Sequence, residues 1–336
     1  MIITCALCKK VYDIPEERLR LQGSSVAFYC QACGNLIEIK LPGKGADGPP
    51  PKDSLVSGDA LKKRILMTVE DLPPMPQVAQ KARQVIANER SSFRDLARII
   101  ETDQAIATRV LKMANSSYYG LVSKVTSIQH AAALLGMKTL NDLLIFACAG
   151  TLLEQELLGY GLMTGDLWKH SLATAGCARS LAAKKRPHIT DDAFTTGLIH
   201  DCGKIILDPY IAERHDRFMA FLEPEGTSFL DAEKELLGFD HAEIASEVCR
   251  KWHIPENMTL AIQAHHKPSL AGGDELAHIV HAADAIALMT GIGSGIDGMK
   301  YEIDVAVMES LELNSNEIGL HMASALEFVE EALELY

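Results

Sequence analysis

Gly197-Leu198-Ile199-His200-Asp201-Cys202-Gly203-Lys204 is the stretch around which the rest of the chain is organised. An apolar helical run ends here in an adjacent histidine and aspartate, and a lysine follows three residues after the aspartate. A neutral imidazole and a carboxylate at a helix end can converge on one divalent cation. An isolated His-Asp pair is more often a polar helix end, so the pair predicts a metal site only if other segments supply more ligands.

Two further histidines stand on segments with a helical pattern. His170 has Leu167 three residues before it and Thr174 four residues after it, which places its imidazole on the buried stripe of a helix. His241 follows Asp240, which together with a glutamate three residues later is typical of a capping box. We therefore expect His241 in the first turn of a helix.

The last ligand-type residues lie between residues 255 and 287. His265 and His266 end a helical segment, and a proline two residues later stops it. Asp284 is a carboxylate in a helix of otherwise small and apolar residues, where a charge is costly unless it is paired or bound to a metal. His278 and His281 share that helix with Asp284 at steps of three residues, so either could replace one of the ligands.

The order His, His-Asp, Lys, His, His-His, Asp resembles the HD superfamily of metal-dependent phosphohydrolases, and most of all its HD-GYP branch. The resemblance implies two divalent metal ions, such as iron or manganese. One ion would be held by His170, His200, Asp201 and Asp284. The other would be held by His241, His265 and His266. Asp201 would bridge the two ions and Lys204 would face a substrate phosphate, which makes these two the expected catalytic residues.

The chain departs from the HD-GYP pattern directly after the paired histidines. Lys267-Pro268-Ser269-Leu270-Ala271-Gly272-Gly273 stands where the Gly-Tyr-Pro signature would be. The resemblance therefore does not extend to hydrolysis of cyclic dinucleotides.

Residues 1–40 contain two Cys-x-x-Cys knuckles separated by 21 residues. Their cysteines are Cys5, Cys8, Cys30 and Cys33. This spacing predicts a structural zinc ion with four thiolate ligands, because so short a segment has too little apolar area to fold unaided. A redox pair or two disulfides are the alternatives. The segment resembles the small β-type zinc ribbons of bacterial regulators, with short strands around Tyr12, Val26, Phe28 and residues 37–39, and it could contact protein or nucleic acid.

Residues 41–60 have the composition of a linker, with three glycines and four prolines among residues 41–54. From Leu61 onward the apolar residues recur with helical spacing, and strand signals are almost absent. Predicted helices include residues 127–135, closed at Gly136 by a left-handed residue, and 139–151. The acidic, amphipathic C-terminal segment, residues 325–335, predicts a packed closing helix.

Several motifs of this helical region resemble the HDOD domain, an HD-related output domain of bacterial signalling proteins. They are Leu72-Pro73-Pro74-Met75-Pro76, Ile99–Ala105, Val110–Ser116 and Ile128–Gly136, and the resemblance covers roughly residues 60–270. It implies an all-α fold of two helical subdomains. We place these at residues 61–155 and at residues 156–336, the second of which is HD-like and holds the predicted metal site.

Composition and charge exclude some functions. Residues 156–336 carry 30 acidic and 13 basic side chains, and the net charge of the chain is −13, so bulk binding to nucleic acid is not expected. Hydrophobic residues make up 48% of the chain, but no uninterrupted apolar run reaches the roughly 18–20 residues of a membrane span. We see no signal peptide, and the eight cysteines do not form a secreted framework, which predicts a cytoplasmic protein without membrane contact.

Three functions fit these patterns. The HDOD resemblance favours a signal-transduction regulator that binds partner proteins or a nucleotide without turnover. The complete ligand set favours an active metal-dependent phosphohydrolase or phosphodiesterase, in which water activated between two metals attacks a phosphate ester. The third is a site that holds metal for structural reasons alone. The oligomeric state is not encoded in any pattern of the sequence.

Overall fold

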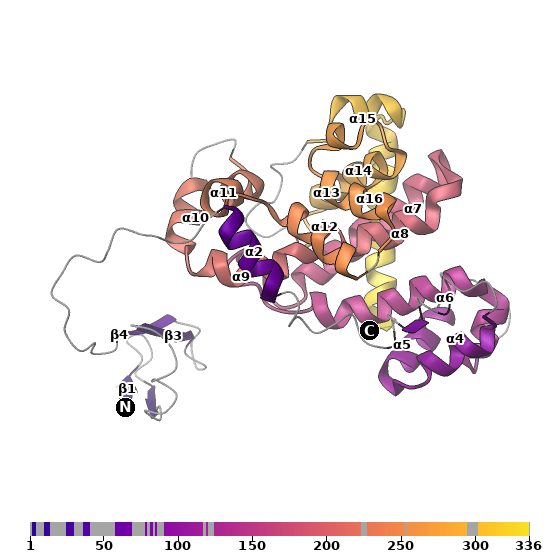
Figure 1. Cartoon of the computed structure of the whole chain (residues 1–336), viewed down its shortest axis with the longest axis horizontal. Helices are drawn as coiled ribbons and strands as arrows, with labels where there is room; N and C mark the ends of the chain where they lie inside the picture. The colour runs from indigo at the N-terminus through magenta and orange to yellow at the C-terminus, as the bar shows by residue number, and fades with distance from the viewer. Residues whose placement is uncertain are drawn as a thin grey trace. The chain divides into compact units, whose positions relative to one another are not determined.

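The computed structural model describes residues 2–4, 10–13, 25–29, 36–40, 58–68, 78, 81–82, 85, 91–116, 119, 124–222, 227–252, 254–293 and 302–335. The chain divides into two compact units, Met1–Leu55 and Val56–Tyr336. Figure 1 shows the first unit with short strands and the second with helices.

The first unit contains two antiparallel strand pairs. The strands are β1 (Ile2–Thr4), β2 (Val11–Asp13), β3 (Ser25–Tyr29) and β4 (Leu36–Lys40). β1 pairs with β2, and β3 pairs with β4 in a register that sets Ala27 opposite Glu38. The four cysteines of the predicted zinc site, Cys5, Cys8, Cys30 and Cys33, lie outside the described residues. The zinc ribbon therefore stays a prediction.

The second unit is helical. Its first helices are α2 (Asp59–Thr68), α4 (Phe93–Ile100), α5 (Gln104–Ala114) and α6 (Ile128–Leu153). Next come α7 (Asp166–Lys185), η2 (Pro187–Ile189), α8 (Thr190–Ile199), α9 (Cys202–Ala212), α10 (His215–Leu222) and α11 (Phe229–Leu237). The last are α12 (His241–Lys251), α13 (Glu256–Ala264), η3 (Pro268–Ala271), α14 (Glu275–Met289), α15 (Val305–Ser310) and α16 (Ser315–Leu335). The described part of this unit contains no strand, only an isolated bridge between Leu157 and Leu162, so the predicted all-α class is confirmed for it.

Helix α7 is the centre of the packing and contacts α8, α14 and α16. Most of its residues are buried all round, because small side chains let the neighbouring helices approach closely. A side chain at Gly176 would meet the Phe328 ring of α16 at 2.7 Å, and one at Gly197 of α8 would meet Ala175 of α7 at 3.1 Å. The predicted C-terminal closing helix is thereby confirmed as a packed element, with Val329 and Ala332 also buried.

Helix α6 contains a break at Gly136. The backbone there has φ 85° and ψ 166°, an extended conformation with positive φ that only glycine adopts readily, rather than the left-handed helical conformation predicted. The span Ile128–Gly150 is long and apolar enough on average to cross a membrane, although Lys138 and Asp142 interrupt it. Of its most apolar window 56% is buried inside the protein, as expected of a core helix.

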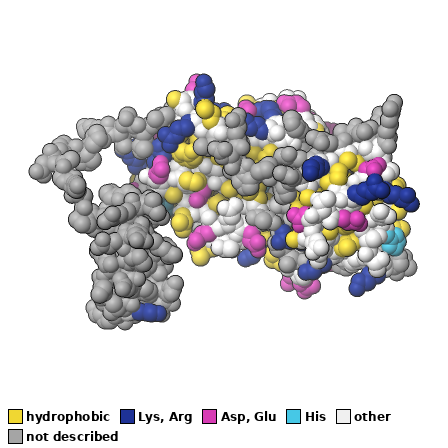
Figure 2. Space-filling view, turned by 60° about the horizontal axis from the view of Figure 1, so that its bottom comes forward, with side chains coloured by type: hydrophobic (Ala, Val, Ile, Leu, Met, Phe, Trp, Pro, Cys, Tyr) yellow, Lys and Arg dark blue, Asp and Glu magenta, His cyan; other side chains and the backbone are white. Residues whose placement is uncertain are grey.

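The first described helix of this unit, α2, packs against its middle part. Lys62 of α2 forms an ion pair with Glu243 of α12 at 2.7 Å, and the Gly58 amide donates to the Leu237 carbonyl at 2.6 Å. Leu61 and Ile65 of α2 are buried, so this helix packs with α12. On the face shown in Figure 2 acidic and basic side chains are interspersed and form no single basic patch.

Candidate metal centre

The seven side chains predicted as metal ligands come from five places in the fold and meet in one buried cluster. They are His170, His200, Asp201, His241, His265, His266 and Asp284. His170 and Asp284 project from α7 and α14, which pack against each other. His200 ends α8 and Asp201 begins α9, so the sharp junction of the two helices turns both side chains inward. His241 begins α12, where Asp240 caps the helix as predicted, and His265 ends α13.

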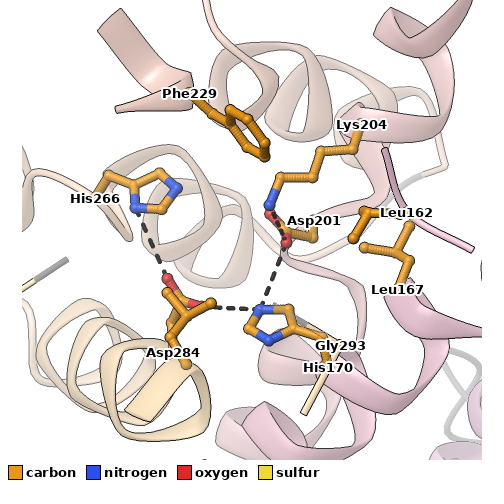
Figure 3. Close-up of a pocket in the computed structure, with 10 residues that line it drawn as sticks. Leu162, Leu167, His170, Asp201, Lys204, Phe229, His266, Asp284 and Gly293 are labelled. Atoms are coloured by element: carbon orange, nitrogen blue, oxygen red, sulfur yellow. Dashed lines mark hydrogen bonds and ion pairs between the residues drawn. The ribbon is translucent and has the colours of Figure 1, made fainter. Parts of the chain in front are cut away.

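One half of the cluster joins α7, α8 and α14. The His170 Nε2 atom lies 3.0 Å from Asp284 Oδ1 and 3.6 Å from Asp201 Oδ2. The His200 Nε2 atom lies 3.4 Å from Asp284 Oδ1 and 3.5 Å from Asp201 Oδ2. Figure 3 shows His170, Asp201 and Asp284 pointing toward one another. Two imidazoles and two carboxylates thus surround one position, which suits a divalent cation.

The other half shares Asp201 and adds three histidines. The Asp201 Oδ1 atom lies 3.2 Å from His241 Nε2 and 3.8 Å from His265 Nε2. The Nε2 atoms of His241 and His266 are 2.9 Å apart. Two nitrogens bound about 2.1 Å from one ion at a right angle would be separated by about 3 Å, so this spacing fits a shared ion. Asp201 presents one oxygen to each half and could bridge two ions.

Because the cluster is buried, leaving it without a cation costs free energy. Exposure is 0% for His200, His241 and His265 and 1% for Asp201. His200 Nε2, His265 Nε2 and Asp201 Oδ1 form no hydrogen bond within the described part of the chain, although all three atoms face the cluster. A buried polar atom without a partner costs about 1–3 kcal/mol. The residues therefore fit bound metal: an ion in the first half would satisfy His200 Nε2, and an ion in the second half would satisfy His265 Nε2 and Asp201 Oδ1.

The outer nitrogens of three histidines are held so that the inner ones face the cluster. His200 Nδ1 lies 2.8 Å from the Gly197 carbonyl, and His265 Nδ1 lies 2.6 Å from the Ile262 carbonyl. His241 Nδ1 lies 2.8 Å from a carboxylate oxygen of Glu233. A carbonyl or carboxylate accepts only from N–H, so each Nδ1 carries a proton. This arrangement orients each ring and directs its Nε2 toward a metal.

The ionisation states agree with this arrangement. Burial opposes charge on Asp201, but His200, Lys204 and His241 outweigh it and hold the pKa of Asp201 well below its usual range. Burial and the neighbouring His200 lower the pKa of His265 to about 3, so this ring is neutral. Burial also opposes a proton on His241, but Glu233 outweighs it and raises the pKa of His241 to about 10. A carboxylate that favours a proton at Nε2 favours a metal cation at the same atom.

A pocket opens onto the cluster beside Lys204. The Lys204 ammonium donates to Asp201 Oδ2 at 2.7 Å, and Figure 3 shows the lysine entering from the side opposite His170. The rest of the wall is largely apolar and includes Phe229, Leu162 and Leu167. The pocket therefore combines one cation and apolar surface next to the candidate metal positions.

Two alternative ligands are placed elsewhere. The His281 ring lies between the His265 carbonyl, 2.6 Å from its Nδ1, and the Asp304 amide, which donates to its Nε2 at 2.9 Å. His281 thus supports the backbone of a predicted ligand instead of facing the cluster. His278 Nδ1 lies 3.1 Å from the Ser310 hydroxyl, at an exposed position.

Sequence patterns did not identify two buried polar residues. His321 carried no predicted role but is 4% exposed, with its Nδ1 2.9 Å from the Ser180 hydroxyl between α16 and α7. Glu233 is fully buried against His241 and carried no predicted role. Neither residue has a local signal, because its partner lies on another helix. Cys148, Cys177, Cys202 and Cys249 are buried free thiols.

Comparison with known proteins gives the family and the fold. An HDOD domain protein of unknown function from Geobacter sulfurreducens superposes with a TM-score of 0.64 at 21% identity, over 82% of this chain and 97% of that one. A protein from Marinobacter aquaeolei VT8 named "Putative signal transduction protein" superposes with a TM-score of 0.63 at 21% identity, over 82% of this chain and 64% of that one. A "Putative phosphohydrolase" from Shewanella amazonensis SB2B gives a TM-score of 0.58 at 24% identity, over 80% and 97%.

At these identities the three structures establish a shared fold. A protein from Treponema pallidum (strain Nichols), named "Uncharacterized protein", is 24% identical over 203 residues, and the match spans 59% of this chain but only 38% of that relative. The HDOD domain model matches residues 72–268, which is more than half of the chain. The chain therefore belongs to the HDOD domain family, and it carries a buried His/Asp cluster that resembles an HD-type metal site.

Proposed function

We propose that this chain is a signal-transduction regulator whose helical domain binds two divalent metal ions and, over them, a phosphate-bearing ligand or partner. The regulatory part is supported by the HDOD family and by the signalling name of the Marinobacter relative. The observation that carries the binding part is the convergence of Nε2 atoms on Asp201 while their Nδ1 atoms are held from outside. Such orientation by outer hydrogen bonds is typical of metal-ligating histidines.

Each residue then has a defined role. One ion would lie among His170, His200, Asp201 and Asp284. The second would lie among Asp201, His241, His265 and His266. When bound, the ions would supply positive charge that attracts and polarises phosphate oxygens. Lys204 adds a cation at the pocket wall, and Phe229 offers an apolar surface to the rest of a ligand.

Metal analysis of the purified protein tests the proposal. The wild-type chain should contain metal beyond the single zinc expected at the cysteines, and Asp201→Ala should lose it, because both halves of the cluster share this carboxylate. The predicted zinc at the cysteines should stay, which makes it an internal control. Equal metal content in the two proteins would refute the assignment.

Hydrolysis of a phosphate ester is the second candidate. The pocket favours it, because Lys204 and the shared carboxylate of Asp201 lie together at the opening to the cluster. A screen of phosphomonoesters and phosphodiesters with manganese or iron should then give turnover that both Asp201→Ala and Lys204→Ala abolish. Metal binding with no turnover on any ester would contradict this second candidate and favour the regulator.

The N-terminal cysteines carry a separate proposal. Cys5, Cys8, Cys30 and Cys33 would hold one structural zinc ion, which the Cys-x-x-Cys spacing supports. Four thiolates leave no open coordination position, so this zinc would stabilise a fold and take no part in chemistry. Replacing Cys30 with serine should remove one equivalent of zinc without changing the metal content of the helical domain.

A further inference from the structure

We propose that Glu233 is a positioning residue that acts on one of the two metal positions, the one at His241, and strengthens its binding of an ion. This inference rests on the proposed function, since it requires that the cluster binds metal. Its basis is the different partner that each ligand histidine has at its outer nitrogen.

Glu233 holds the His241 imidazole from behind. Its carboxylate oxygens lie 2.9 and 2.8 Å from His241 Nδ1, and the His241 backbone amide donates to one of them at 2.7 Å. The Tyr160 hydroxyl donates to the other oxygen at 2.6 Å. Glu233 and His241 are both 0% exposed, so no water competes for these contacts. The carboxylate is thus fixed at two points, with its charge directed at the imidazole.

Three of the other ligand histidines, His170, His200 and His265, have no carboxylate at the outer nitrogen, whereas His266 Nδ1 lies 3.7 Å from Asp284 Oδ2. His200 and His265 face backbone carbonyls, which are neutral acceptors. His170 Nδ1 has no hydrogen-bond partner within the described part of the chain. A charged acceptor increases electron density on the ring and strengthens its bond to a cation more than a neutral one does. Glu233 therefore strengthens the half-cluster with His241 and does not act on the other half, whose second carboxylate, Asp284, faces its own position directly.

A capping role for Glu233 does not account for these contacts. Asp240 already caps α12, since its side chain accepts from the Glu243 amide at 2.8 Å. Burying the Glu233 carboxylate is costly, and a neutral side chain could accept the same backbone hydrogen. A buried negative charge at this place is stabilising only if a positive charge forms on the other side of the ring. That side carries the Nε2 atom, which lies 3.2 Å from Asp201 Oδ1.

The test is a titration of the full chain, with its cysteines loaded with zinc, by Mn²⁺, an ion that thiolate sites disfavour. Free Mn²⁺ is followed by electron paramagnetic resonance. The wild-type protein should bind two ions with different dissociation constants. Glu233→Gln should weaken one of the two by about 10–100-fold and leave the other within a few fold. Tyr160→Phe, which keeps the charge but removes one of its two anchors, should weaken the same ion by a smaller factor.

Glu235→Gln is the matched control, because Glu235 lies on the same helix but is exposed, and it should change neither constant. No Mn²⁺ binding by the wild-type chain would refute the proposed function itself. The inference would be overturned if Glu233→Gln bound two ions as the wild-type chain does, or if it bound both ions more weakly by the same factor at an unchanged melting temperature. The proposed metal site would stand in either case. If Glu233→Gln does not fold, Tyr160→Phe is the deciding variant: binding of both ions as in the wild-type chain, or equal weakening of both, overturns the inference.

Discussion

Asp142 of α6 is a buried carboxylate outside the metal cluster. It is 4% exposed, its Oδ1 accepts from the Thr195 hydroxyl at 2.9 Å, and its Oδ2 has no hydrogen-bond partner among the described residues. Burial raises the pKa of Asp142 to about 7, although the Thr195 hydrogen bond opposes this. The folded protein thus keeps a proton there that the unfolded chain, with an aspartate pKa of about 3.9, releases much earlier.

This difference predicts a pH dependence of stability. As pH rises from about 4 to 7, the unfolded chain binds fewer protons at this site than the folded one, so the free energy of unfolding falls. The free energy of unfolding lost in this way reaches its full value above pH 7. Asp142→Asn has no carboxyl group to titrate here, so its free energy of unfolding is not lowered. Urea unfolding should therefore find the variant more stable than wild type by about 1–4 kcal/mol at pH 8 and similar to it at pH 4. A difference that is constant across this range would contradict the assignment.

Two residues of the buried cluster could be singled out from the sequence because they are chemically out of place. Asp284 is a carboxylate among small apolar residues, and His170 lies on an apolar stripe, so both stand out without any knowledge of the fold. Glu233 gives no such signal, since it stands among lysine and glutamate residues typical of an exposed helix. Its partner Tyr160 is 73 residues away in the chain, and only packing brings the two together.

At the level of helices, Gly203 sets how closely α9 approaches α12. A side chain there would lie 2.0 Å from the His241 carbonyl oxygen and 2.9 Å from the Ala245 nitrogen, both of them backbone atoms that cannot give way. Gly203→Ala should therefore push the helices apart, lower the free energy of unfolding by roughly 1–3 kcal/mol or more, and reduce metal content. Gly203, two residues after Asp201, thus sets the helix spacing at the cluster.

Gly319 of α16 provides the matched control, because a side chain there meets nothing within 4 Å. It is exposed and lies within a helix, so Gly319→Ala should stabilise the protein by about 0.5–1 kcal/mol. Thermal melting of both variants checks the pair. If Gly203→Ala were as stable as wild type, the close approach of α9 and α12 would be wrong.

Asn115 gives the family motif Val110–Ser116 a structural role at the end of α5. Its side-chain amide donates to the carbonyls of Leu111 and Val125 at 2.8 Å each, and its oxygen accepts from the Val125 amide at 2.7 Å. Asn115→Ala would leave these backbone groups without partners and should cost about 2–3 kcal/mol of unfolding free energy in urea. The metal content should stay unchanged, since Asn115 lies on no element of the cluster. Loss of metal without loss of stability would contradict this role.

Helix boundaries were predictable from local signals, whereas helix packing was not. Ser127 caps α6 through the His130 amide, and the break at Gly136 falls where the sequence predicts the end of one helix and the start of another. The direction in which the chain continues after Gly136 depends on its backbone angles, which no side-chain pattern specifies. Likewise α2 is the first of the described helices but packs with α12, through contacts that join residues 181 positions apart.

For the whole molecule, the division into Met1–Leu55 and Val56–Tyr336 predicts that the larger unit is self-sufficient. The described hydrophobic core of this unit runs from Leu61 to Ala332. A fragment of residues 56–336 keeps the Gly58 contact to Leu237 and the whole cluster. The fragment should therefore fold. Its melting temperature should equal that of the helical unit in the full chain, and its circular dichroism spectrum should be typical of helices.

The same fragment separates the two predicted kinds of metal. Removing the cysteines should reduce the metal content by one zinc, whereas the Mn²⁺ bound by the helical domain should keep its two dissociation constants, because every ligand and every outer hydrogen-bond partner lies within residues 160–284. A folded fragment that had lost its Mn²⁺ would mean that the N-terminal unit contributes to the cluster. An unfolded fragment would mean that the larger unit depends on the smaller one for stability, and the division into independent units would then be wrong.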